Sequence, residues 1–184
     1  MTLIRRRLLQ LGGTLALLRP ETIRAEEPVL IRMRSDGDGA HVGFDPVGLL
    51  IQPGRTVRFL CEANYHTTAA YHPANASHSL RIPRTAQPWA SEVLQPGEQF
   101  EVTLTVPGVY DYFCAPHEQA GMVGRLIVGE PIGPGSEPFD WFKGRTEGRD
   151  WLPVPVAARS VFPAIHEIIR RGNIPASLVG MVHK

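Results

Sequence analysis

The sequence has little of several features by which common protein classes are recognised. It has no excess of positive charge, because removing residues 1–25 takes away five arginines and one glutamate and moves the formal charge from +1 to −3. Such a chain offers no basic surface for nucleic acid. The apolar stretch from Leu8 to Leu18 has about eleven residues, whereas a helix needs roughly 20 to cross a bilayer, so no stable membrane span is expected in the mature form. The nucleophile elbow of a hydrolase is also missing.

The first 25 residues resemble an export signal. Three consecutive arginines, Arg5 to Arg7, precede the short apolar stretch, as in a twin-arginine signal, and we expect cleavage near Ala25. An ordinary secretory signal with a chance arginine cluster is the alternative, and the shortness of the stretch disfavours a retained anchor. Either signal sends the protein out of the cytoplasm, so we predict a periplasmic or extracytoplasmic location.

Short apolar segments separated by turn residues follow from Val29 onward. Residues 55–62 and 99–106 alternate most clearly, with every second residue apolar, and this period is that of a strand with one buried face. Pro-Gly pairs at 53–54 and 107–108 mark turns next to these strands. The pattern is typical of an all-β fold, a β-sandwich, and not of a helical or α/β fold.

The composition changes after the last apolar segment. A proline- and glycine-rich run at 131–136 begins what we predict to be a C-terminal extension, residues 131–184. One short helix is expected in it, at about 163–171. The residues expected on one face of that helix are Phe162, Ile165, Ile168 and Ile169. Because so short a helix is marginal alone, we expect this face to pack against the sandwich and not against a partner.

A thiol, an imidazole and a thioether lie within nine residues, at Cys114, His117 and Met122. Cys114 ends one predicted strand, Met122 begins the next, and His117 lies in the loop between them. Thiolate and imidazole suit copper in both oxidation states, and a weak axial thioether tunes the reduction potential. A thioether is a poor zinc ligand, so Met122 favours copper over zinc. The spacing C-x2-H-x4-M therefore indicates three quarters of a blue-copper site.

This segment resembles the plastocyanin and pseudoazurin branch of the cupredoxins, whose last two strands and copper loop also have the pattern Y-x-Y-x-C-x-P-H-x4-M. The resemblance covers roughly residues 28–130 and implies a Greek-key β-sandwich, with Cys114, His117 and Met122 as copper ligands and Pro116 stiffening the loop. Two other copper classes are excluded. A binuclear centre would need two bridging cysteines in the last loop, and only Cys114 is there. A multicopper oxidase would need paired His-x-His motifs, and the sequence has none.

The resemblance places the fourth ligand just after the exit of an earlier strand, and we choose His66 there. His72 is the competitor, although its position before a proline favours a surface turn. The family usually follows this histidine with Asn or Asp, and here the residue is Thr67, whose hydroxyl could still hydrogen-bond to the cysteine loop. His78 lies in the same polar insertion as His72, and we expect it to be solvated. The remaining histidines are interpreted as structural or solvent-exposed: His41, His166 and His183.

The chain contains two cysteines, Cys61 and Cys114. An exported protein with an even cysteine count usually forms a disulfide, and such a bond would turn the chain into a metal-free interaction domain. A disulfide explains neither His117 nor Met122, so we interpret Cys61 as a small buried thiol.

We therefore predict an electron carrier, not an enzyme, that holds one type 1 copper ion and shuttles single electrons between redox proteins. The alternative is a copper-binding or delivery protein with no electron-transfer role. By the resemblance, His117 presents its ring edge at the surface, where redox partners would dock in a small, transient encounter. Glu118 at this rim is expected to influence the charge of the partner. The small apolar residues of the predicted docking surface are Ala115, Pro116, Ala120 and Gly121.

Overall fold

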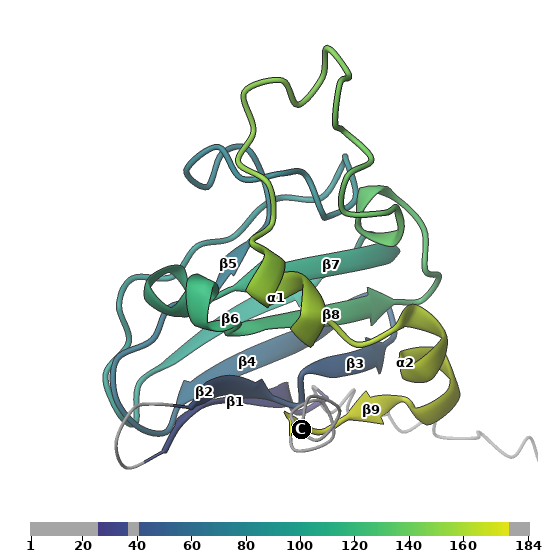
Figure 1. Ribbon diagram of the computed structural model, residues 1–184. Coiled ribbons are helices and arrows are strands. Elements are labelled where there is room, and N and C mark those ends of the chain that lie inside the picture. The colour runs from purple at the N-terminus through teal and green to yellow at the C-terminus, as the bar shows by residue number, and fades with distance from the viewer. Residues whose placement is uncertain (1–25, 37–40, 177–184) are drawn as a thin grey trace, which may run out of the picture.

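A computed structural model describes residues 26–36 and 41–176 of the protein (Figure 1). The elements in chain order are β1 (Val29–Ser35), β2 (Val42–Asp45), β3 (Gly48–Ile51), β4 (Arg55–Cys61), β5 (Ala69–Ala70), β6 (Gln99–Leu104), β7 (Gly108–Phe113), η1 (Ala115–Ala120), β8 (Val123–Val128), η2 (Pro134–Ser136), α1 (Val156–Val161), α2 (Ile165–Arg171) and β9 (Asn173–Ile174). None of the helices in these ranges is long and apolar enough to cross a membrane. The predicted export signal and His183 lie outside the described residues.

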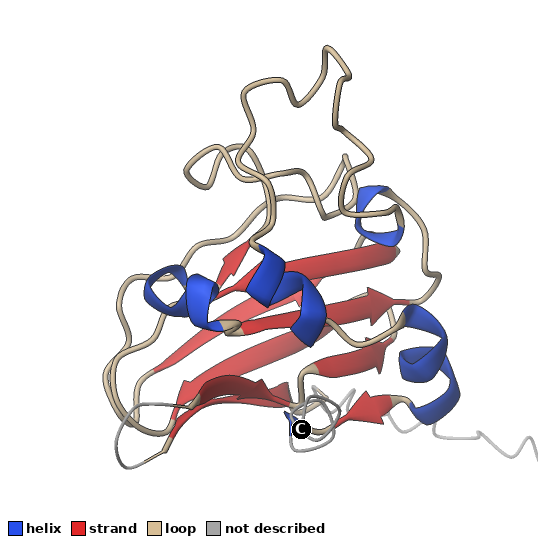
Figure 2. Ribbon diagram, viewed as in Figure 1, coloured by secondary structure: helices blue, strands red, loops and turns tan. Residues whose placement is uncertain are grey.

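The strands form two sheets, drawn in red in Figure 2. One has the strand order β2-β1-β4-β6 and the other the order β5-β7-β8-β3-β9. Both sheets are mixed, because β1 pairs parallel with β4 and β3 parallel with β8, while β7 and β8 form an antiparallel hairpin. Side chains from both sheets share one core cluster. The predicted cupredoxin-like β-sandwich is therefore confirmed.

Period-two alternation builds the core between the sheets. In β4 the three inward residues, Val57, Phe59 and Cys61, are fully buried. The Tyr112 ring lies between the sheets and meets the Phe59 ring edge-on at 5.2 Å. Opposite it on β8 is Gly124, where an added Cβ would lie 2.3 Å from the tyrosine hydroxyl. A residue without a side chain is therefore required at this position for the ring to lie across the neighbouring strand.

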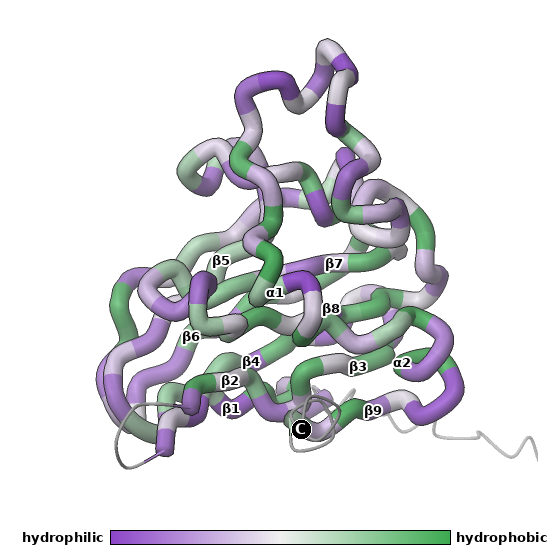
Figure 3. Tube along the Cα trace, viewed as in Figure 1, coloured by the Kyte–Doolittle hydropathy of each residue, from purple (hydrophilic) through white to green (hydrophobic). Residues whose placement is uncertain are grey.

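The outer face of the β7–β8 hairpin is also buried, which the alternation does not predict. Every residue of the two strands is buried. The outward side chains pack against the C-terminal extension, and α1 lies across this face in Figure 1, where Figure 3 colours much of β3 and β8 as hydrophobic. The residues that form these outer contacts include Val109, Phe113, Val123 and Ile127 of the hairpin and Val154, Ala158 and Ile168 of the extension. The extension thus serves as a third layer over one sheet.

The extension contains two short helices where the sequence predicted one. The helix α2 agrees with the expected range of 163–171, but α1 precedes it, and residues 162–164 separate the two. The helix α2 ends where Gly172 adopts a φ of +74°, and the Gly172 N–H bonds to the Ile168 carbonyl at 2.7 Å. Ile168 is fully buried, as expected. Ile169 is 47% exposed, so its predicted place on the packed face is wrong.

A buried ion network joins the extension to the hairpin. Asp111 on β7 is fully buried and accepts hydrogen bonds from Arg81 Nε at 3.0 Å and from Arg125 Nε at 2.7 Å. Both guanidinium groups also bond to carbonyls of the extension: Arg81 to Gly135 at 2.7 Å and Arg125 to Pro163 at 3.0 Å. A charge removed from water must be paired and hydrogen-bonded. The network therefore fixes the extension at a defined position on the sheet.

Candidate metal centre

Residues 114–122, which we call the ligand loop, connect β7 to β8 and are closed by main-chain hydrogen bonds. The Cys114 N–H donates to the Met122 carbonyl at 3.0 Å, and the Met122 N–H donates to the His117 carbonyl at 3.1 Å. Gly121 has a φ of +90°, a left-handed conformation that glycine adopts without steric cost. The loop is therefore a compact turn that returns the chain to β8 directly opposite Cys114.

His66 reaches the ligand loop from the segment that follows β4, a strand of the other sheet. It follows β4 along the chain and forms an isolated β-bridge with Leu94, with hydrogen bonds of 3.1 and 2.8 Å between the two main chains. The His66 side chain is fully buried. These bonds fix the main chain beyond the strand exit, so the imidazole is held within the sandwich instead of moving in solvent.

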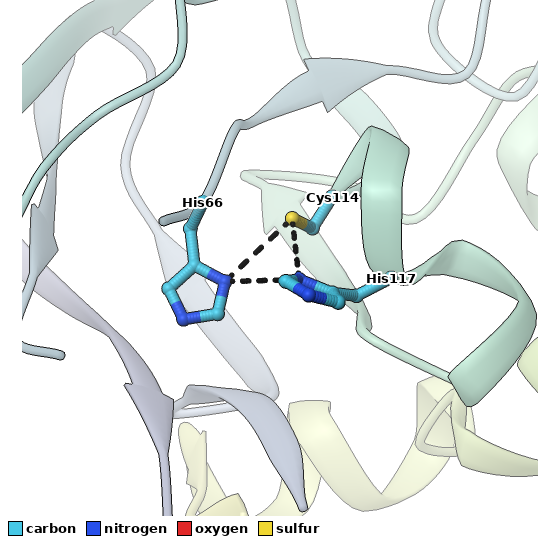
Figure 4. Close-up of side chains that lie close together, drawn as sticks. All are labelled: His66, Cys114 and His117. Carbon is cyan, nitrogen blue, oxygen red and sulfur yellow. Dashed lines mark hydrogen bonds between the residues drawn. The ribbon is translucent and has the colours of Figure 1, made fainter. Parts of the chain in front are cut away.

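Three potential ligand atoms meet at this end of the molecule (Figure 4). The Nδ1 atoms of His66 and His117 are 3.2 Å apart, and Cys114 Sγ lies 3.7 Å from the first and 3.4 Å from the second. These are the His and Cys residues of one candidate metal-binding group. One thiolate and two imidazoles are the donor set that suits copper. The structure thus brings together three of the four predicted site residues.

The fourth, Met122, is fully buried and belongs to the same core cluster as Cys114. Its main chain is bonded to both Cys114 and His117. A thioether is an apolar, weak ligand, and Met122 could supply one to a copper ion held by the other three residues. Its assignment as a ligand stays a prediction.

Ser35 orients His66, a role that no pattern in the sequence indicates. Its hydroxyl lies 3.0 Å from His66 Nε2, so the other ring nitrogen, Nδ1, is directed towards Cys114 and His117. Metal-binding histidines usually have such a second partner, which fixes the tautomer and the ring orientation. Ser35 ends β1, the parallel neighbour of β4, and only this strand pairing brings it close to a residue 31 positions away.

Thr67 connects the His66 segment to the ligand loop. The Ala115 N–H donates to Thr67 Oγ1 at 2.8 Å, and the Thr67 N–H points to Cys114 Sγ at 3.3 Å. The expectation that this hydroxyl bonds to the cysteine loop in place of Asn or Asp is therefore confirmed. A donor to the sulfur also disperses the charge of a thiolate.

In the metal-free protein, the electrostatic surroundings favour the uncharged forms of His66 and Cys114. Burial, followed by the neighbouring His117 ring, lowers the pKa of His66 from 6.5 to about 4. Burial likewise raises the pKa of the Cys114 thiol, although the hydrogen bonds from Thr67 act in the opposite direction. At neutral pH the His66 ring is therefore uncharged and can offer a lone pair to a metal ion. The Cys114 thiol must lose its proton when a metal ion binds.

The other histidines that the structure describes lie outside this group of ligand atoms. His72 is outside the group formed by His66, Cys114 and His117, and its Nδ1 accepts a hydrogen bond from the Ala74 N–H at 3.1 Å. Two further histidines of the described chain are solvent-exposed, as expected: His41 and His166.

Both cysteines are free thiols, so the disulfide alternative is wrong. The Cys61 thiol is buried in the sandwich core and donates to the Ala63 and Asn64 carbonyls at 3.6 and 3.4 Å. The Cys114 sulfur is therefore available to bind a metal ion together with His66 and His117.

The structure corrects two predictions on the far side of the ligand loop. Glu118 is 8% exposed and does not lie at the rim, and His78, expected to be solvated, is 9% exposed. Glu118 accepts a hydrogen bond from the Tyr71 hydroxyl at 2.6 Å, and its other oxygen lies 3.2 Å from His78 Nε2. Neither residue has a sequence pattern that reveals this pairing, because the two lie 40 positions apart.

Most of the predicted docking surface is accessible. Ala115, Pro116 and Ala120 are exposed, and His117 is partly exposed between them. Gly121 is buried, and a Cβ added there would lie 2.9 Å from Val161 Cγ2. The helix α1 therefore borders this surface on the Gly121 side.

Comparisons with known proteins agree with this geometry. Residues 31–129 match the family described as copper binding proteins, plastocyanin/azurin family. The plastocyanin of Hordeum vulgare is 33% identical over 91 residues, which are 50% of this chain and 57% of that protein. The pseudoazurin of Methylorubrum extorquens is 28% identical over 122 residues, or 65% of this chain and 74% of the relative. The chain thus spans less than two thirds of the plastocyanin that it matches.

A solved structure of a Sinorhizobium pseudoazurin supports the same assignment. It is 30% identical, with a TM-score of 0.55, and the match covers 80% of this chain and 99% of that one. The matched family segment contains all four predicted site residues. The protein therefore belongs to the plastocyanin/azurin family of copper-binding proteins, and copper is its cofactor.

Proposed function

We propose that the protein is an exported electron carrier, not an enzyme, in which His66, Cys114, His117 and Met122 hold a single type 1 copper ion. The convergence of His66 Nδ1, His117 Nδ1 and Cys114 Sγ within 3.2–3.7 Å of one another carries this proposal. Relatives named plastocyanin and pseudoazurin support it. Copper bound there supplies a one-electron couple between Cu(I) and Cu(II).

The residues of the chain perform three tasks in this function. The Ser35 hydroxyl and the His66 bridge to Leu94 hold one imidazole in a fixed orientation. Thr67 holds the sulfur of Cys114. Because the ligand atoms are fixed by bonds outside the centre, they need to move little when the charge of the centre changes, which lowers the reorganisation that each transfer requires.

The third task is contact with the redox partner. His117 is partly exposed, whereas His66, Cys114 and Met122 are buried, so its ring edge is the ligand nearest to solvent. We propose that redox proteins dock on Ala115, Pro116 and Ala120 around this edge, with Gly121 as the buried floor. Small apolar groups allow close approach and rapid separation, as brief electron-transfer encounters require.

The visible absorption spectrum of the copper-loaded protein tests the proposal. We expect an intense thiolate-to-copper band that disappears on one-electron reduction and returns on oxidation. A copper delivery protein would instead transfer the ion itself, so incubating the oxidised protein with a chelator, and separately with a reduced carrier protein, distinguishes the two functions. A folded, copper-loaded protein without the band would contradict the proposal.

Location needs its own experiment. We propose a periplasmic or extracytoplasmic site reached through a twin-arginine-like signal in residues 1–25. Changing Arg6 and Arg7 together to lysine should leave the protein in the cytoplasmic fraction of the cell. Unchanged export would instead support an ordinary secretory signal.

A further inference from the structure

Consecutive residues of the ligand loop point to opposite sides. His117 Nδ1 faces Cys114 and His66, whereas the Glu118 carboxylate faces Tyr71 and His78. Glu118 is 8% exposed. A carboxylate removed from water in this way is unfavourable unless its oxygens are hydrogen-bonded, so its surroundings must be arranged to hold it.

Both carboxylate oxygens have a partner of their own. The Tyr71 hydroxyl, fully buried, donates to Oε1 at 2.6 Å, and His78 Nε2 lies 3.2 Å from Oε2. Hydrogen bonds to a charged acceptor are about twice as strong as those between neutral groups. Two such bonds in different directions fix the side chain in both position and orientation.

The partners are fixed in turn by packing and hydrogen bonds. His78 Nδ1 lies 2.5 Å from the Asn75 carbonyl, and the His78 ring stacks on Phe113 with centroids 4.3 Å apart. The Tyr71 ring also packs on Phe113, with centroids 4.6 Å apart. Phe113 is the last residue of β7 and directly precedes Cys114. The cluster that holds Glu118 therefore rests on the strand that presents the cysteine.

The ligand loop has few other side-chain contacts of this kind. Its short helix η1 lacks a side-chain cap at its start. The main-chain bonds of the loop run between its own residues. Outside the group formed by His66, Cys114 and His117, two sets of described side-chain hydrogen bonds attach the loop to the rest of the protein. Thr67 holds the Cys114 end, and Tyr71 and His78 hold Glu118 beside His117.

We propose that Glu118 is a positioning residue of the metal centre: held by Tyr71 and His78, it fixes the ligand loop so that the His117 ring stays directed at Cys114 with or without copper. This inference rests on the proposed copper-binding function. It assigns a role to a cluster that lies outside the ligand set and that uses residues from the segment between β5 and β6.

The test compares Glu118→Ala with the exposed control Glu147→Ala, whose carboxylate pairs with Arg84 at the surface. In the metal-free protein, amide hydrogen exchange reports loop order. We expect the amides of His117, Gly121 and Met122 to exchange faster in Glu118→Ala, by a larger factor than the amides of β4. In the copper-loaded protein, release of copper to a chelator should accelerate about tenfold, the lower end of the effect seen when partners of metal ligands are removed. The control should match the parent in both measurements.

Two milder variants keep the proposal testable if Glu118→Ala folds poorly. Glu118→Gln retains an oxygen for the Tyr71 hydroxyl and should restore most of the parent release rate. Tyr71→Phe removes one donor and keeps the buried ring, and it should accelerate release about threefold, as expected for one hydrogen bond.

The outcomes separate this inference from the proposed function. If the parent protein shows no thiolate-to-copper band, the copper function itself fails. If the parent has the band but Glu118→Ala and Tyr71→Phe keep the parent release rate and the parent exchange of the loop amides, a role in positioning is overturned, even when the melting temperature falls. Loop-specific exchange together with faster release supports it.

Discussion

Two buried histidines lie on opposite sides of the ligand loop, and their pKa values are shifted in opposite directions. His66, on the inner side, is fully buried, and its pKa is lowered to about 4 by burial and then by the His117 ring. His78, on the outer side, is 9% exposed. Burial also lowers the pKa of His78, but hydrogen bonds to Glu118 and to the Asn75 carbonyl outweigh it, and the pKa is raised above 6.5.

The partner, not burial, causes this difference. The polar neighbours of His66 are a hydroxyl, a second imidazole and the Cys114 thiol. Burial raises the pKa of that thiol, so none of the three supplies a negative charge and the neutral ring of His66 is favoured. His78 faces a carboxylate, which favours the protonated ring. The inner side therefore offers a free lone pair to a metal ion. The outer side holds a contact between a carboxylate and an imidazole that can anchor the loop.

The largest expected effect separates the two cysteines of the sandwich. Cys114→Ser should abolish the thiolate-to-copper band, because an alcohol neither ionises readily nor donates like sulfur. Cys61→Ser should keep the band and cost on the order of 1 kcal/mol of unfolding free energy, because it makes a small buried group polar. Visible absorption and urea unfolding measure both. Loss of the band in Cys61→Ser would assign that thiol to the centre.

The next prediction weakens the contact between the C-terminal extension and the β7–β8 hairpin and leaves the metal centre intact. Ile168→Asp puts a charge into the contact between the extension and the hairpin, and the free energy of unfolding should fall by a few kcal/mol. The neighbouring Ile169→Asp is the matched control, because Ile169 is 47% exposed and the change should stay within about 0.5 kcal/mol. Equal losses from the two variants would mean that the extension does not stabilise the sandwich through this helix.

The inner side was largely predictable from the sequence, and the outer side was not. Cys114, His117 and Met122 lie close together in the chain, so their spacing alone indicates shared chemistry. His66 was found through its place after a strand, in a family whose fold fixes that place. The alternating strands of the sandwich were also apparent, because one buried face imposes a period of two.

The outer side depends on contacts between distant segments. Glu118 and His78 lie 40 positions apart, and each appears in the sequence as an ordinary polar residue in a loop. The extension that buries the outer face of the hairpin has no period of its own beyond two short helices. Asp111 would be assigned to a solvated face, yet two arginines from separate segments make its full burial possible. Such pairings follow from tertiary packing, which no local pattern encodes.

A third prediction uses pH to sharpen the contrast in the metal-free protein. The pKa of His66 is about 4 in the folded state and near 6.5 when unfolded, so between these values the unfolded chain binds more protons. Stability present above pH 6.5 is therefore lost as pH falls towards 4, by at most about 3 kcal/mol. His78 has the opposite sign, because its raised pKa gives stability that is present below pH 6.5 and lost as pH rises through the folded value.

Urea unfolding between pH 4.5 and pH 8 measures these slopes in three variants. His66→Gln should remove the loss of stability on the acidic side, and His78→Gln should remove the loss on the alkaline side. His166→Gln, a change at a side chain that is 80% exposed, should leave both. An acidic loss that persists in His66→Gln would show that another group titrates, and the proposed contrast between the two histidines would not hold.

The smallest expected change concerns the fourth ligand on the inner side. Met122→Leu keeps a buried apolar side chain of similar volume, so the fold and the copper content should be retained. If the thioether is a weak donor that stabilises Cu(II) more than Cu(I), its removal should raise the reduction potential, by on the order of 60 mV for a tenfold change in the one-electron equilibrium. Redox titration followed at the thiolate-to-copper band measures the shift, and Met33→Leu, at a fully buried methionine on β1, is the matched control that should leave the potential unchanged. A fall in potential, or loss of copper, would mean that Met122 is not a weak axial ligand.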